Sequence, residues 1–235
     1  MFGDSGQFHP QQPIQFMEGL LDPIIGSQGP TFSIGALQSD TVSRTTYTFT
    51  VDIGAADDAR AMHFLCTTTA TGASTSFSSG TIAGASLANS IDLQVSVSYC
   101  TILSARVPAS AGSGNQTLSI TLSSAATYFT VFPYRSMMLN SLTPVATLTS
   151  SANPGTGAIN VSERGLLFAT ARQGNTTCTY TWAGVNEDFD ATIGATGRSA
   201  SGGSYQAGAA EVGRTVTATR SAAGNNFTMV AASFR

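Results

Sequence analysis

Hydrophobic and polar residues alternate along much of the chain after about residue 31, as expected for half-buried antiparallel strands. In the segment 45–53, every second residue is large and apolar, and the residues between them are mostly threonines. Segments 90–99 and 116–122 repeat this alternation. Each segment therefore predicts one strand with a single buried face. The predicted buried residues are Tyr47, Phe49, Val51 and Ile53, then Ile91, Leu93, Val95, Val97 and Tyr99, then Leu118, Ile120 and Leu122.

Two other segments, 128–132 and 165–171, are continuously apolar, as in central strands that are covered on both faces. Clusters of Gly, Pro, Asn and Asp separate the predicted strands, which number about ten to twelve. After residue 30 no helical periodicity extends beyond about two turns. The sequence thus predicts an all-β fold, an antiparallel β-sandwich of jelly-roll type, as a single domain over 31–235. The loop near 152–157 is the only candidate linker.

Residues 1–30 differ in composition and are predicted to form an N-terminal arm. They contain four of the eight prolines, and residues 14–21 can form two helical turns before Pro23 ends them. Such a short segment is not stable alone and needs an apolar surface to pack against. It either packs on its own domain or docks on a partner subunit; the composition shift favours docking. The residues expected to dock are Ile14, Phe16, Met17, Leu20, Leu21, Ile24 and Ile25.

The charge composition excludes several functional classes. All ten basic residues are arginines, 13 residues are acidic, and the net charge is −3. Without lysine there is no Walker A lysine and no Schiff-base lysine. Ten scattered arginines in an acidic chain form no footprint for nucleic acid. We expect no membrane-spanning helix and no secretory signal, because neither apolar pattern is present.

The densest acidic cluster consists of Glu187, Asp188 and Asp190. Asp188 and Asp190 are expected to share one strand face, where their oxygen atoms could hold calcium or another hard cation. The alternative is a solvated loop or strand edge. No other cofactor is expected.

A second acidic group, Asp57 and Asp58, follows a strand in a turn, and Arg60 can pair with either carboxylate. Asp is favoured in turns because it caps backbone N–H groups, which predicts a structural corner rather than an acid–base pair. His63 lies in an apolar strand and is expected to be a packing residue. The three cysteines are widely spaced, which predicts buried free thiols.

Two segments rich in small polar residues, 69–76 and 196–205, are predicted to be long surface loops. Their tips could touch a glycan or a neighbouring subunit. Phe77 and Tyr205 would then serve as aromatic platforms, because an aromatic ring beside hydroxyl groups suits a sugar face.

Four segments together resemble a family of virion structural proteins of tailed bacteriophages and prophages. They are residues 47–60, 165–171, 181–190 and 229–234. The resemblance covers about residues 45–235 and rests on short motifs. It implies a β-sandwich in a virus particle and carries over no catalytic residue. Residues 70–90 are richer in Ser, Gly and Ala than the family pattern, and the N-terminal arm lies outside it.

The sequence therefore predicts a non-enzymatic virion protein on the particle exterior. It would form homo-oligomers and bind other virion proteins through the arm. The first interpretation places it in a tail fibre, spike or tail tip that contacts the host surface, with a surface glycan as a further partner. The alternatives are a capsid decoration, cement or head-spike protein and a polysaccharide-degrading enzyme, which would need two facing carboxylates.

Overall fold

The computed structural model describes residues 29–71, 74–174, 176–194 and 197–235, and it is built almost entirely of β-strands. Most of the predicted arm lies outside the described residues. The first half of the chain forms β1 (Thr31–Ile34), β2 (Gln38–Asp40), β3 (Arg44–Asp52), β4 (Arg60–Ala70), β5 (Phe77–Ile82), β6 (Ala85–Ser86), β7 (Ala88–Val95), β8 (Ser98–Arg106) and β9 (Asn115–Met137), with a 3-10 turn at Ala109–Ala111. The second half forms β10 (Ala146–Ser150), β11 (Gly155–Val161), β12 (Leu166–Gln173), β13 (Tyr180–Ala183), β14 (Asn186–Thr192), β15 (Ser199–Gln206), β16 (Glu211–Arg220) and β17 (Phe227–Phe234).

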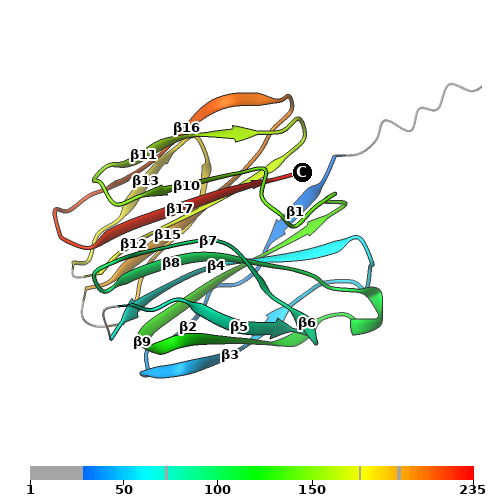
Figure 1. Ribbon diagram of the computed structural model, residues 1–235, viewed down its shortest axis with the longest axis horizontal. Helices are drawn as coiled ribbons and strands as arrows, with labels where there is room; N and C mark the ends of the chain where they lie inside the picture. Colours follow the sequence, from blue (N-terminus) through cyan, green and yellow to red (C-terminus); the bar gives the residue numbers. More distant parts are fainter. Residues whose placement is uncertain (1–28, 72–73, 175, 195–196) are drawn as a thin grey trace, which may run out of the picture.

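The first sheet contains all nine strands of the first half, and every pairing in it is antiparallel (Figure 1). Its central element is β9, a strand of 23 residues. Along one edge β9 pairs in turn with β3, β2 and β1, and along the other with β5 and β4. Since one strand serves five partners, the sheet must bend along β9.

The first sheet curls until its two edges approach each other. The backbone N–H of Phe77 at the start of β5 donates to the Tyr99 hydroxyl at 2.9 Å, and Thr75 N–H donates to the Gln94 side chain on β7. The interior of this roll is a closed apolar cluster, here called the roll core. It contains Tyr47, Phe49, Val51, Ile53, Leu118, Ile120 and Leu122, which confirms two of the predicted strand faces.

The second half forms two further antiparallel sheets. The second sheet has the order β10-β17-β12-β15-β14, and the third has β11-β16-β13. The second sheet lies between the other two. Its strand β12 is fully buried, as the apolar segment 165–171 predicts, because one face packs on the first sheet and the other on the third. The predicted all-β sandwich is therefore confirmed, with three sheets in the stack.

A shared core joins the two halves. It packs Leu65, Ile102 and Tyr134 of the first sheet against Phe168 and Phe234 of the second, among others. Between the halves the chain crosses over residues 138–145, whereas the loop at 152–157 belongs to the connection between β10 and β11. Because the two halves bury a common core, separating them would expose the apolar side chains of that core on both halves.

Two predicted elements are wrong. The segment 90–99 is a hairpin and not one strand: β7 ends at Val95, Ser96 takes a left-handed φ of 52°, and β8 begins at Ser98. The turn moves Tyr99 into the roll core, whereas Ile91 and Leu93 pack on the shared core. The alternation continues through the turn, so it conceals the break.

The second wrong element is the predicted loop at 196–205, because residues 199–206 form β15, which pairs with both β12 and β14. Its small residues are needed for packing. A Cβ atom at Gly202 would overlap the Phe189 ring, and one at Gly203 would overlap the Asn186 carbonyl. A run of Gly and Ser here allows close approach of the neighbouring strand.

Candidate functional site

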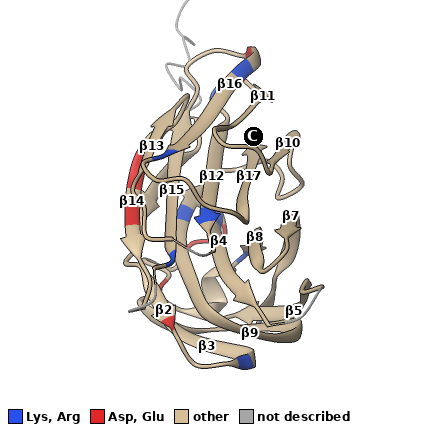
Figure 2. Ribbon diagram, turned by 90° about the vertical axis from the view of Figure 1, so that its left-hand side faces the viewer, with Lys and Arg blue, Asp and Glu red and all other residues tan. Residues whose placement is uncertain are grey.

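The acidic cluster lies on β14, at the edge of the second sheet, where acidic positions mark a red band in Figure 2. A β-bulge between Glu187 and Phe189 inserts one extra residue, Asp188. The Asp188 carboxylate accepts a 2.7 Å hydrogen bond from the Tyr134 hydroxyl of the first sheet. The Asp190 carboxylate accepts one of 2.8 Å from Tyr180 N–H of the third sheet. The two carboxylates point to opposite sides of β14, so the prediction of a shared face is wrong.

Burial raises the pKa of Asp188, and the hydrogen bond from Tyr134 lowers it in part. Burial likewise raises the pKa of Asp190, against hydrogen bonds from backbone groups at Tyr180 and Ala191. Through their hydrogen bonds, Asp188 connects β14 to the first sheet and Asp190 connects it to the third sheet. Within the described ranges, no group of three or more His, Cys, Asp or Glu side chains could hold a metal ion.

The predicted corner at residues 57–60 is structural, as expected for Asp in a turn. Asp57 caps Ala59 N–H at 2.7 Å, and Asp58 accepts from Ala109 N–H at 2.7 Å. The prediction that Arg60 pairs with either carboxylate is wrong. The Arg60 guanidinium is fully buried and donates to backbone carbonyls instead. The shortest of these bonds reach the carbonyl oxygens of Ala55 (2.7 Å), Pro108 (3.0 Å) and Gly112 (3.1 Å).

His63 is a packing residue, as predicted. Its Nδ1 and Nε2 atoms lie 2.9 Å from the hydroxyl oxygens of Ser104 and Ser136, respectively, and the ring contacts Phe168 and Phe234. Burial lowers the pKa of His63 to about 3. The ring is therefore neutral at physiological pH, and both nitrogen atoms are occupied. The three cysteines are free and buried, as predicted.

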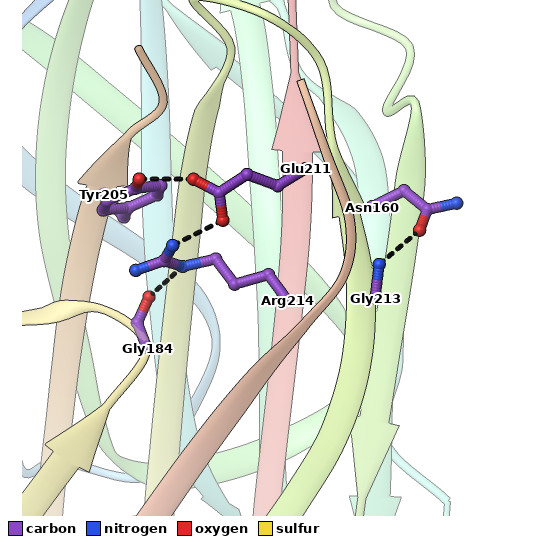
Figure 3. Close-up of polar contacts among 6 residues, drawn as sticks. All are labelled: Asn160, Gly184, Tyr205, Glu211, Gly213 and Arg214. Carbon is purple, nitrogen blue, oxygen red and sulfur yellow. Dashed lines mark hydrogen bonds and ion pairs between the residues drawn. The ribbon is translucent and has the colours of Figure 1, made fainter. Parts of the chain in front are cut away.

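Tyr205 does not lie at a flexible tip, so that prediction is wrong. It sits in β15, and Figure 3 shows its hydroxyl directed at Glu211 of β16. Glu211 also pairs with Arg214, whose Nε donates to the Gly184 carbonyl at 2.6 Å. The Arg214 guanidinium stacks on the Tyr205 ring, 3.4 Å from its centroid. This network raises the pKa of Tyr205 through its hydrogen bond to Glu211, and it covers one face of the ring.

Phe77 also differs from its predicted role. It begins β5 and packs against the roll core, so its ring is partly buried. The predicted loop at 69–76 is wrong at its start, because Thr69 and Ala70 belong to β4 and are buried. Neither proposed aromatic platform is therefore a freely displayed ring.

The structure instead displays two outward faces lined by hydroxyl groups. The first hydroxyl face lies on β3, β9 and β5, where cross-strand registers place threonines and serines side by side. The second hydroxyl face lies on β11, β16 and β13 of the third sheet. Hydroxyl pairs Thr46–Thr121 (3.0 Å) and Thr156–Thr217 (2.9 Å) cross adjacent strands. The first face comprises Thr46, Thr48, Thr50, Ser79, Thr81, Thr117, Ser119 and Thr121; the second comprises Thr156, Thr181, Thr215, Thr217 and Thr219.

These two faces lie at opposite ends of the sheet stack (Figure 1). The apolar residues between their threonines, such as Phe49 and Val216, are buried in the cores below. The sequence shows the alternating threonines of each strand, but it does not show which strands from distant segments pair and bring their threonines side by side. A cavity at one end of the roll, containing Arg135, gave no sequence signal at all.

Comparison with protein-family models found no match, and neither the curated proteins nor the solved structures gave a significant match. Within the described residues, no helix is long and apolar enough to cross a membrane. The fold and the hydroxyl faces therefore carry the functional argument.

Proposed function

We propose that the protein is a non-enzymatic structural component of a tailed-phage virion. It is displayed on the particle exterior in a tail fibre, spike or tail-tip assembly, and it contacts the host surface. The resemblance of residues 45–235 to phage virion proteins supports the virion assignment. The predicted N-terminal arm anchors the domain to other virion proteins, and the domain assembles as a homo-oligomer.

The two hydroxyl faces are the observation that best supports contact with the host surface. A Ser or Thr hydroxyl both donates and accepts hydrogen bonds, which matches the hydroxyl groups of a sugar chain. The central rows of both faces consist of uncharged side chains held on paired strands. A rigid surface of this kind loses little conformational entropy when it binds. It suits broad, weak contact with a polysaccharide surface.

The first test is binding of the purified full-length protein to cells of the host bacterium, measured by cosedimentation. The variant Thr48→Glu/Ser119→Glu places two carboxylates on the first hydroxyl face. It should lower cell binding at least about fivefold, because contact with the cell surface would remove water from the two carboxylates without giving them a partner. Thr217→Glu tests the second face in the same way. Cell binding that neither variant changes would contradict the role of these faces.

Capsid decoration is the second candidate, and the exposed apolar side chains favour it. Met138 is 53% exposed and lines a cavity of about 430 Å³ together with Gly29 and Pro30, where the described chain begins. Val145 and Val212 are also exposed. Apolar groups of this kind suit contact with neighbouring virion proteins. Under this alternative the protein would assemble on the capsid and would not bind host cells.

A further inference from the structure

The roll of the first sheet has an open end with a cavity of about 430 Å³. Its lining includes Met62, a member of the roll core, and the other lining residues come from β1 and the segment that follows it, from the end of β3 and from β9. The cross-strand registers bring these lining residues together, because Arg135 of β9 pairs with both Met62 of β4 and Ser33 of β1. The mouth of a closed sheet is a common position for small-ligand sites. The lining residues are Ser33, Ile34, Gly35, Ala36, Asp52, Met62, Pro133 and Arg135.

Arg135 brings an unused guanidinium to this cavity. Within the described ranges its side chain makes no ion pair or hydrogen bond: the ion pairs there are Arg44–Asp40, Arg164–Glu163 and Arg214–Glu211. By contrast, the neighbouring Arg60 is saturated by backbone carbonyls. A guanidinium has five donors in a planar fork, and a carboxylate, like a phosphate group, matches this fork in two parallel hydrogen bonds.

The local backbone makes room for this guanidinium. Gly54 has a φ of 71°, and a Cβ atom there would overlap the guanidinium of Arg135. Asp52 lines the same cavity, and its Oδ1 accepts from Gly54 N–H at 2.7 Å. The second carboxylate oxygen of Asp52 remains for a ligand hydroxyl. The site therefore offers a cation, an acceptor and a hydroxyl (Ser33) around one hollow.

We propose that this cavity binds a single sugar unit that carries a carboxylate. The ligand carboxylate pairs with the Arg135 guanidinium, and ring hydroxyls bond to Asp52 and Ser33. The apolar face of the sugar ring lies on Ile34, which is 48% exposed and lines the cavity beside the buried Pro133. A volume of about 430 Å³ is within the range of small-ligand pockets. The choice of a sugar rests on the proposed host-surface role, whereas the anionic group on that sugar follows from Arg135.

The test is an NMR titration of the full-length protein, followed by ¹H–¹⁵N chemical-shift changes. The probes are D-glucuronate, N-acetylneuraminate and D-glucose, which has a hydroxymethyl group where glucuronate has its carboxylate. We expect one of the two acids to bind and to shift the signals of residues 33–36 and 52–54. Glucose should bind at least about tenfold more weakly, because it leaves the guanidinium unpaired. The two acids distinguish a hexuronic-acid source from a sialic-acid source.

Variants assign the effect to Arg135. Arg135→Gln should weaken binding of the acid at least about tenfold, and Arg135→Lys should restore part of it, because the charge remains but the fork is lost. Arg44→Gln, on an exposed ion pair, is the matched control and should bind normally. Equal binding by Arg135→Gln, equal binding of glucose, or no response to either acid would overturn the inference. If host-cell binding persists in that case, the proposed function stands without this site.

Discussion

Replacement of Arg60 by methionine tests how the corner at residues 57–60 is held. The guanidinium donates to three carbonyl oxygens within 3.1 Å, those of Ala55, Pro108 and Gly112. Each hydrogen bond from a charged group contributes about 1.5–3 kcal/mol, and methionine fills much of the volume but donates nothing. The full sum would be about 5–9 kcal/mol, but the corner lies near the surface, where water can reach part of the freed carbonyls. We therefore expect Arg60→Met to lower the free energy of unfolding by about 3–4 kcal/mol.

The assay is urea unfolding at pH 7, followed by the fluorescence of Trp182 and by circular dichroism. With an m value of about 3 kcal/mol/M, the loss lowers the urea midpoint by about 1 M. Arg44→Met is the control: Arg44 forms an exposed ion pair with Asp40, and its loss should cost less than about 1 kcal/mol. Equal midpoints for the two variants would refute the view that Arg60 holds the corner through its carbonyl contacts.

Three further predictions concern the interior. Because burial holds the pKa of His63 at about 3, the folded ring stays neutral while the unfolded ring protonates below its ordinary pKa of 6.5. The free energy of unfolding therefore falls as the pH is lowered from about 6.5 toward 3, by about 2–3 kcal/mol at pH 4.5. In urea unfolding at pH 7 and pH 4.5, the loss of stability between the two pH values should be smaller for His63→Gln than for wild type by this amount. An equal loss in the two proteins would disprove the prediction. The three cysteines should not react with a thiol reagent in the native protein and should all react in urea; fast native labelling would contradict their burial. Gly202→Val should destabilise the fold by about 2 kcal/mol or more, since the new side chain overlaps Phe189, whereas Gly208→Val, with open space around it, should be nearly neutral in the same unfolding assay.

The sequence predicts β3 correctly because one face of this strand is apolar throughout and no turn interrupts it. The residues from Tyr47 to Ile53 alternate because β3 covers the roll core with one face and carries threonines on the other. The continuous apolar segment before Arg172 is equally informative, because the second sheet is covered on both sides. In these segments, burial follows from local spacing alone.

The failures arise where distant residues decide the local structure. Residues 199–204 of β15 are only Ala, Gly and Ser, because the Phe189 ring lies against Gly202 and leaves no space for larger side chains, and no local pattern shows this. The bulge at Asp188 turns two carboxylates to opposite sides, and a regular strand spacing cannot reveal such an insertion. Arg135 faces an open cavity only because the first sheet curls around β9. Candidate sites in this chain are therefore set by the stacking of sheets.

We propose that the protein is displayed on the exterior of a tailed-phage particle at its host-contacting end. The most direct measurement is cryo-EM of purified particles with this protein labelled, beside particles from which it is deleted. We expect deletion to remove density from the tail end and to lower adsorption to host cells. Loss of density from the capsid surface, with normal adsorption, would contradict host contact and favour capsid decoration. Particles with no label and unchanged density would contradict the virion assignment itself.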